Sequence, residues 1–287
     1  MNFFEQSSHR SICSLTRDEI FEKRNQVNKA AIEQLLDKLP SELREVLLSA
    51  EEEAMLWHYY HRKIPEICRY FKFPPTVTAT AHWLLSRCSL GLSVLQYDPK
   101  HVMLAAILLA TKLEGLHLTM DQYAAKIPNT DAELLIELEF VLLASLDYKV
   151  FFFSPNAALA GVLLELKALS EGPLEDGPSW DSKWIAESSV LLDRICATDA
   201  LLMYSPSCLA LVSLLMILPE GKHKEALLQK IVPFTRLARS GEPLDDALLT
   251  VGNLMNDFSA LDPEKIKAID RRLLQIRKAP TINPGDK

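Results

Sequence analysis

Residues 99–110 read PKHVMLAAILLA, a proline followed by a nearly unbroken apolar run. Proline suits the first turn of a helix, because an N–H at that position has no partner within the helix. A helix that is apolar around most of its circumference is surrounded by other helices rather than exposed on a surface. The stretch therefore predicts a central, buried helix.

The same pattern recurs in the second half of the chain. Residues 206–217 read PSCLALVSLLMI, again a proline followed by apolar residues. We expect two units of about 100 residues, each built around one such helix, which is an ordinary size for a domain. Because any two buried helices look alike, the pattern alone leaves open a single bundle without a true repeat.

Helix signals surround these stretches, and strand signals do not. Thr16–Glu19 and Thr130–Glu133 have the spacing of capping boxes, and Asp262–Glu264 places a cap, a proline and an acid at a helix start. We find no alternating strand and no hairpin dipeptide. The sequence predicts an all-α chain with four parts: an N-terminal segment and helix (1–49), a first repeat (50–150), a second repeat (151–260), and a C-terminal helix and tail (261–287).

Amphipathic helices are predicted at both ends of the chain. Their apolar stripes are Ile20, Val27, Ala31 and Leu35 before the repeats, and Ile266, Ile269, Leu273 and Ile276 after them. A lone helix of that length is marginally stable in water. We expect both helices to pack on the first repeat.

Composition indicates an ordinary globular protein. The chain has 287 residues, of which 48% are hydrophobic and 24% are charged, and its formal charge is −7. The negative charge argues against a protein that neutralises many phosphates, so we expect no direct contact with nucleic acid. The five cysteines form no CxxC pair and suit a reducing compartment. We see no secretory signal, and the longest apolar run is far shorter than the ~20 residues of a membrane span, so no membrane contact is expected.

Motifs for catalysis, cofactors and metals are missing. Gly172 and Gly177 are followed by a proline rather than by the lysine of a phosphate-binding loop. The cysteines stand in apolar helices, where a thiolate is costly. His58 and His61 lie three residues apart near Glu51–Glu53, but no Glu-x-x-His pairing supports a metal site, and an exposed helix face is the favoured interpretation. We expect neither an enzyme nor a bound cofactor or metal.

Lys112 and Glu139 are the two charged residues that stand out. Lys112 ends the apolar run HVMLAAILLATKLEG (101–115), where a lysine also suits the last turn of a helix before Gly115. Glu139 lies among leucines in LLIELEFVLLASLDY (134–148). A carboxylate in that setting needs a cation or several N–H donors. We predict that the two residues pair, and the pattern leaves open whether the pair is structural or functional.

Residues 78–114, which contain Lys112, resemble the first box of the cyclin family, and Glu139 follows at the position of the fifth helix of that repeat. The resemblance implies two tandem five-helix cyclin-box repeats flanked by N- and C-terminal helices. It also implies a cyclin-dependent kinase catalytic subunit as partner, because the family's lysine–glutamate pair bonds the backbone before the kinase C helix. The residues expected to bind the kinase are Lys112, Glu139, Leu109, Leu113, Leu143 and Val150.

Within the family, residues 48–53, 194–211 and 263–273 are similar to the cyclin H branch. That branch implies a regulatory subunit of the CDK-activating kinase complex, with an assembly-factor third subunit and general transcription factor IIH as further partners. The implied substrates are CDK activation loops and the RNA polymerase II tail, and the implied location is the nucleus. The terminal helices are expected to support the kinase contact.

Two other interpretations stay open. Residues 2–9, NFFEQSSH, resemble the cyclin C branch, which belongs to the Mediator kinase module. A nucleic-acid-binding relative similar to general transcription factor IIB is disfavoured by the acidic composition and by the missing CxxC pair. The chain also departs from the family pattern at 84–90, where little but Arg87 and Leu90 matches, and at 154–158.

Overall fold

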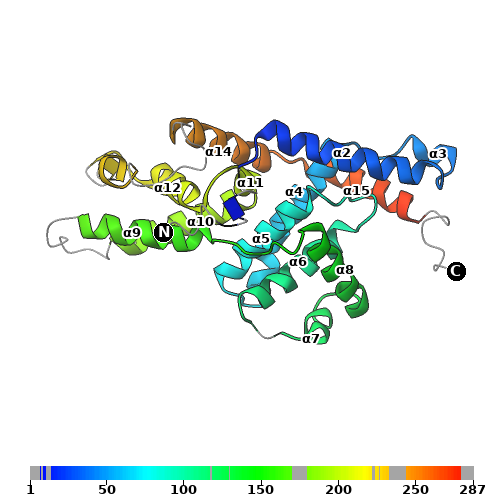
Figure 1. Ribbon diagram of the computed structural model, residues 1–287, viewed down its shortest axis with the longest axis horizontal. Coiled ribbons are helices and arrows are strands. Elements are labelled where there is room, and N and C mark those ends of the chain that lie inside the picture. The colour runs from blue at the N-terminus through cyan, green and yellow to red at the C-terminus, as the bar shows by residue number, and fades with distance from the viewer. Residues whose placement is uncertain are drawn as a thin grey trace. The chain divides into compact units, whose positions relative to one another are not determined.

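The computed structural model describes residues 7, 9–10, 14–116, 118–128, 130–169, 180–221, 224–225, 227–232 and 244–278. Over these ranges the regular structure is helical and contains no strand, so the all-α prediction is confirmed (Figure 1). Within the same ranges, no helix combines the length and apolar character that crossing a membrane requires. Most of the N-terminal stretch 2–9, Cys13 and the tail 279–287 lie outside the described residues.

The chain divides into two compact units. The first, called here the α6 unit, contains residues 16–150 and 258–287, and the second, the α12 unit, contains residues 1–15 and 151–257. Each unit is named after its central helix. The four sequence ranges given above for the repeats and their flanks stay predictions.

The α6 unit is built around α6 (Pro99–Leu113). Proline occupies its first turn, the Asp98 side chain accepts a hydrogen bond from the Lys100 N–H at 2.8 Å, and every residue from Val102 to Thr111 is buried. It packs against α4 (Ala50–Tyr70), α5 (Pro75–Cys88) and α8 (Ala132–Ser145), and α7 (Met120–Ala124) packs on α8. The central, buried helix predicted from residues 99–110 is therefore confirmed.

The α12 unit has a central helix of the same kind. In α12 (Pro206–Ile217) the residues from Cys208 to Leu215 are buried, and Ser205 caps the first turn. The helices α9 (Pro155–Leu169), α10 (Trp180–Cys196) and α11 (Ala200–Met203) pack on it. The unit also contains η1 (Leu227–Ile231), and α14 (Leu244–Ser259) lies in it up to residue 257.

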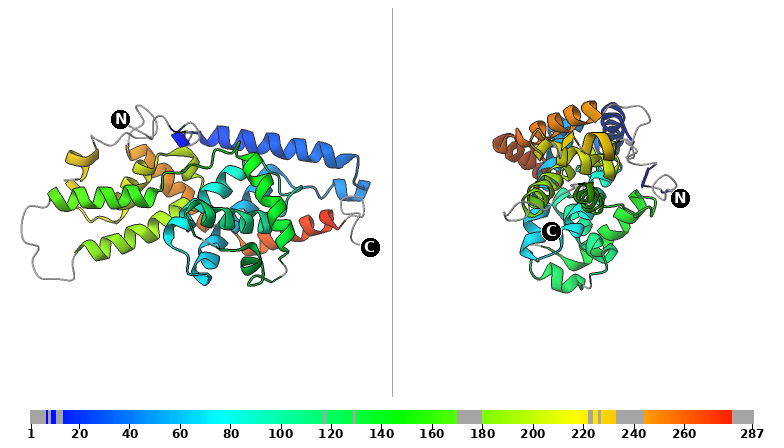
Figure 2. Two further views of the ribbon diagram at one scale, coloured as in Figure 1. Left: turned by 60° about the horizontal axis from the view of Figure 1, so that its bottom comes forward. Right: turned by 90° about the vertical axis from the view of Figure 1, so that its left-hand side faces the viewer.

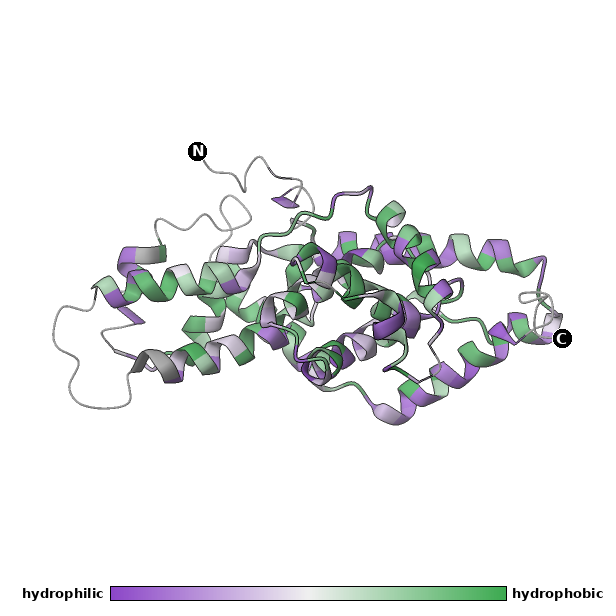
Figure 3. Cartoon of the chain, turned by 90° about the horizontal axis from the view of Figure 1, so that it is seen from below, coloured by the Kyte–Doolittle hydropathy of each residue, from purple (hydrophilic) through white to green (hydrophobic). Residues whose placement is uncertain are grey.

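The terminal helices α2 (Arg17–Leu36) and α15 (Pro263–Arg277) both pack on α4, as Figure 2 shows, and the short helix α3 (Ser41–Arg44) lies between α2 and α4 in sequence. The α15 stripe is buried as predicted, and the alternation of polar and apolar residues along that helix can be followed in Figure 3. The α2 stripe differs, because Val27 is only half-buried whereas the polar Arg24 and Asn28 are buried. These two side chains are tolerated because each has a partner: Arg24 donates to Ser89 Oγ at 2.9 Å.

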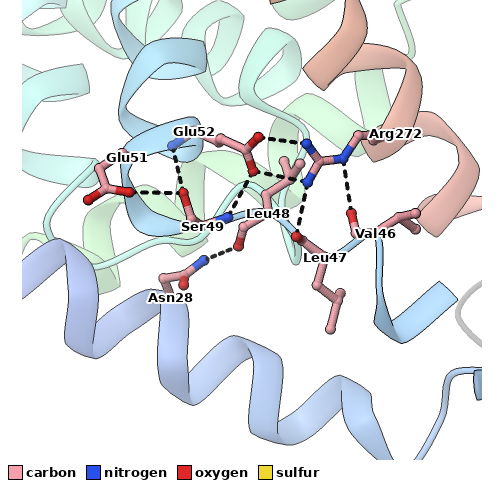
Figure 4. Close-up of polar contacts among 8 residues, drawn as sticks. All are labelled: Asn28, Val46, Leu47, Leu48, Ser49, Glu51, Glu52 and Arg272. Atoms are coloured by element: carbon pink, nitrogen blue, oxygen red, sulfur yellow. Dashed lines mark hydrogen bonds and ion pairs between the residues drawn. The ribbon is translucent and has the colours of Figure 1, made fainter.

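Polar contacts fasten both terminal helices to the start of α4 (Figure 4). Arg272 of α15 donates to the two carboxylate oxygens of Glu52 at 2.6 and 3.0 Å, and to the carbonyls of Val46 and Leu47 at 3.3 and 3.1 Å. Asn28 of α2 donates to the Leu48 carbonyl at 2.9 Å. A guanidinium that engages a carboxylate in this forked way fixes orientation as well as distance.

A second arginine of α15 reaches the start of α6. Arg277 pairs with Asp98, the capping residue of α6, at 2.5 Å and donates to the Val94 carbonyl at 2.6 Å. Burial lowers the pKa of Arg277, and the adjacent Asp98 carboxylate opposes that effect only in part. Through Arg277, α15 therefore stabilises the first turn of α6, and Lys112 lies in the last turn of the same helix.

His61 is a correction to the sequence interpretation, because the face of α4 that carries it is not exposed. The side chain is 2% exposed, and its Nδ1 lies 2.9 Å from Nδ1 of His82, which is fully buried on α5. One ring must donate and the other accept, so the two rings cannot both carry a proton on Nδ1. His82 Nε2 has no hydrogen-bond partner. If His82 carries its proton on Nδ1, Nε2 is an acceptor, so no buried N–H is left without a partner at this atom. No group of three or more metal-binding side chains occurs among the residues that the structure describes.

Acidification should destabilise the chain through His82. Burial lowers the pKa of His82 to about 3, from 6.5 for an ordinary histidine. Between about pH 7.5 and about pH 5 the unfolded chain gains this proton and the folded chain does not, which costs about 2 kcal/mol of unfolding free energy. Glu53 and Asp193 have raised pKa values, so their protonation stabilises the folded chain as the pH falls and opposes the effect of His82. The test therefore compares the loss of stability of a variant with that of the wild type. In urea titrations, His82→Gln should lose less stability than the wild type over that pH interval; equal losses would contradict the assignment.

Candidate functional site

Lys112 lies in the last turn of α6, and the end of that helix is closed tightly. The Leu116 N–H returns to the Thr111 carbonyl at 2.8 Å, and Gly115 between them has a φ of 74°. That left-handed conformation suits glycine and ends the helix directly after the lysine. Thr80 of α5 also donates to the Glu114 carboxylate at 2.6 Å. The backbone that carries Lys112 is therefore fixed on both sides.

Glu139 of α8 faces this helix end and meets the lysine. Lys112 Nζ lies 2.6 Å from Glu139 Oε1 and 2.7 Å from Oε2. The pairing predicted from the sequence is confirmed. The Lys112 side chain is 45% exposed and that of Glu139 is 16% exposed. A pair this open to water contributes only ~0–1 kcal/mol to folding, so stability alone gives little reason for it.

Exposed apolar side chains surround the pair. Leu113 is 41% exposed, Ile136 43% and Phe140 65%, and Leu143 is half-buried. On α8, residues 136, 139, 140 and 143 recur at the spacing of one helix face. We call the set Lys112, Leu113, Ile136, Glu139, Phe140 and Leu143 the Lys112 surface. Such an apolar patch around a half-open ion pair is typical of a protein-binding surface rather than of a catalytic site.

The residues predicted to bind a kinase are distributed unevenly. Leu113 follows Lys112 directly in the sequence, Leu143 lies one helical turn after Glu139, and Val150 is half-buried in the same unit. Leu109 is only 4% exposed, one turn before Lys112 in the core, so it offers a partner almost no surface. The binding roles of all six residues stay predictions.

Sequence reasoning missed three exposed apolar residues. Ile136 and Phe140 of α8 and Tyr148, which follows α8, are 43%, 65% and 68% exposed, and none of them is among the residues predicted to bind a partner. The sequence of α8 contains a signal for this exposure. Its apolar residues are spread around the helix instead of forming one stripe, so a single buried face cannot cover all of them. Their spacing of three and one from Glu139 would have placed Ile136 and Phe140 beside the ion pair.

Other candidate sites offer less. Cys68, Cys88, Cys196 and Cys208 are buried, and burial raises the pKa of Cys88 to about 12, so it does not supply a thiolate near neutral pH. An open apolar groove on the α12 unit is lined by Ala186, Glu187, Val190, Leu191, Arg194 and Ile217. Few polar groups converge there, unlike in a small-molecule site. The Lys112 surface is the better candidate.

Comparison with known proteins finds relatives that are named cyclin-H. No family model matches the chain. Cyclin-H of Xenopus laevis is 24% identical over 269 residues, which are 90% of this chain and 82% of that protein. Further curated relatives are also named cyclin-H. This chain is cyclin H-like.

Solved structures agree on the fold of the cyclin H-like chain. A chain of the CAK complex of Chaetomium thermophilum bound to ATP-gamma-S matches with a TM-score of 0.71 and 20% identity, over 98% of this chain and 86% of that one. A chain of the yeast TFIIK (Kin28/Ccl1/Tfb3) complex matches with a TM-score of 0.68 and 24% identity, over 88% and 99%. The cyclin H-like chain therefore has the tandem cyclin-box fold.

Proposed function

We propose that the chain is a regulatory subunit that binds and activates a cyclin-dependent kinase within a CDK-activating kinase complex. The observation that carries this proposal is the Lys112–Glu139 ion pair, held open to solvent within an apolar surface. An ammonium has three N–H donors, and Glu139 accepts two of them. The third donor and the remaining carboxylate lone pairs are available to a backbone segment of a partner.

The chain activates by binding rather than by chemistry. A protein kinase works only when its C-helix glutamate reaches its strand lysine, and a subunit that docks on the C helix stabilises that arrangement. To change a kinase from mostly inactive to mostly active, it must bind the active form ~10⁴-fold more tightly. The chain itself is not an enzyme and supplies no catalytic group.

The relatives support a particular assembly. The similar chains come from a CAK complex and from a complex of three named proteins, Kin28, Ccl1 and Tfb3. We therefore include an assembly-factor third subunit and general transcription factor IIH among the partners. The substrates are CDK activation loops and the RNA polymerase II tail, and the chain acts in the nucleus. The comparisons favour this assignment over the cyclin C interpretation and over a nucleic-acid-binding one.

Reconstitution tests the proposal. The purified chain is titrated into a CDK-activating kinase catalytic subunit, with and without the third subunit, and phosphorylation of an activation-loop peptide is measured. Activity should appear only when the chain is present and should saturate at one chain per kinase. A kinase whose activity does not change, with no complex in size-exclusion chromatography, would contradict the proposed function.

A further inference from the structure

The turn that follows α8 has an unusual backbone. Asp147 and Tyr148 have φ angles of 51° and 56°, so two consecutive residues adopt the left-handed conformation and neither is glycine. Side chains with a Cβ disfavour this region, and such residues persist only where their surroundings hold them. Something must therefore hold residues 147 and 148 in place.

Arg87 of α5 holds this turn from inside the unit. Its guanidinium donates to the Leu146 carbonyl at 3.1 Å and to the Lys149 carbonyl, so the two bonds bracket the left-handed pair. The side chain is only 9% exposed, and its guanidinium lies 5.5 Å from the centre of the Trp83 ring. A planar group with several donors in fixed directions is suited to binding two carbonyls at once.

The turn connects Arg87 to the Lys112 surface. The Tyr148 N–H donates to the Leu143 carbonyl at 2.9 Å, and Leu143 lies one helical turn beyond Glu139. The Tyr148 side chain is 68% exposed. An exposed aromatic ring on a fixed backbone is a common anchor in protein interfaces, because little side-chain freedom is lost on binding.

We infer that Arg87 is a positioning residue for kinase binding: it holds Asp147 and Tyr148 in the left-handed conformation and so sets the place of the Tyr148 ring at the end of α8, the helix that carries Glu139. The inference rests on the proposed function, because the ring needs a kinase to meet. Arg87 makes no contact with the partner itself. A residue that only filled the core would not need to hold both carbonyls that flank the strained pair.

The first test separates positioning from general stability by rescue. Arg87→Met should weaken kinase binding about tenfold, because a misplaced Tyr148 ring loses much of its contribution to the interface. Asp147→Gly makes the left-handed conformation easy without any help from residue 87, so the double variant should return to within about threefold of the wild-type affinity. Lys72→Gly is the matched control, because Lys72 has a φ of 58° at the end of α4, away from the turn. It should not rescue Arg87→Met.

A coupling measurement shows whether Arg87 acts through the ring. In a Tyr148→Ala background, Arg87→Met should have little further effect on kinase binding, since the group that it positions is gone. An equal loss in both backgrounds, or rescue by Lys72→Gly as strong as by Asp147→Gly, would overturn the inference. If Arg87→Met does not fold, Arg87→Lys keeps a donor at this place, and the same comparisons are made with it.

Hydrogen exchange in the free protein makes the test independent of the kinase. The amides of Tyr148 and Lys149 are bonded to the carbonyls of Leu143 and Leu146 and should exchange slowly in the wild type. They should exchange faster in Arg87→Met and slow again in the double variant with Asp147→Gly. Unchanged exchange in Arg87→Met would refute the positioning role even if a kinase binds. Faster exchange in a chain that binds no kinase would refute the proposed function and leave only the hold on the turn.

Discussion

Replacing Lys112 or Glu139 with alanine weakens kinase binding by at least about tenfold, while the free chain stays folded. Each truncation leaves the other charge without its partner in an interface that the kinase desolvates, a loss that commonly costs ~2–5 kcal/mol. Folding is spared because the side chains are 45% and 16% exposed and the pair contributes little to stability in water. Kinase titrations give the affinities, and thermal melts followed by circular dichroism confirm folding.

Two comparisons sharpen this prediction. Lys63→Ala is a matched control, because Lys63 pairs with Glu66 at 3.1 Å in the same unit and is 38% exposed, yet it lies outside the Lys112 surface. It should bind the kinase like the wild type. Because Lys112 and Glu139 act together, the double variant should lose less affinity than the two single losses combined. Single variants that melt and bind like the wild type would reduce Lys112 to a lysine that caps a helix.

Deleting residues 262–287 lowers the melting midpoint of the chain by roughly 10 °C, which is the largest change in stability that we expect. The deletion also weakens kinase activation. The deletion exposes the surface of α4 that α15 covers, and it removes Ile266, Ile269, Leu273 and Ile276 from the core. It also releases Asp98 and Glu52, the carboxylates at the starts of α6 and α4. Differential scanning calorimetry and the kinase assay measure the two effects. Full activation by the truncated chain would show that α15 is dispensable.

Substituting two neighbouring arginines of α15 shows how much its polar contacts contribute to stability, apart from its apolar face. Arg272→Ala leaves the Glu52 carboxylate and two carbonyls without their donor and should cost about 2 kcal/mol. Arg271→Ala is the control, since that side chain is exposed, and should change stability by less than about 0.5 kcal/mol. Burial raises the pKa of Glu52, but hydrogen bonds from Arg272 and Ser49 outweigh it and the pKa is lowered. The contribution of Arg272 is therefore present above about pH 4.5 and is lost as the pH falls.

The elements that sequence reasoning placed correctly have strong and local signals. The buried helices α6 and α12 were found because apolar residues fill their whole circumference after a proline. Lys112 and Glu139 were found because a charge among leucines needs a partner. In both cases the residues that carry the signal lie within one or two helical turns of each other.

What was missed depends on neighbours that are distant in sequence. His61 looked exposed because its partner, His82, lies on another helix. Phe140 was not predicted as part of the site, because its 65% exposure depends on which neighbouring helices cover α8, and the sequence of α8 alone does not show this. The turn at 147–148 gave no warning, since it has no glycine and Arg87, which holds it, lies about sixty positions earlier. Periodicity within one helix cannot reveal such partners.

The place of α15 in the sequence affects how the protein is made. After residues 1–15, the ribosome synthesises residues 16–150 of the α6 unit and then residues 151–257 of the other unit. The helix α15, which packs on α4 and pairs with Asp98 at the start of α6, is made only afterwards. A nascent chain that has reached the second unit therefore contains Lys112 and Glu139 but does not yet contain α15, which packs on α4 and pairs with Asp98. The α6 unit can therefore complete its packing around α4 only after residues 151–257 have been synthesised.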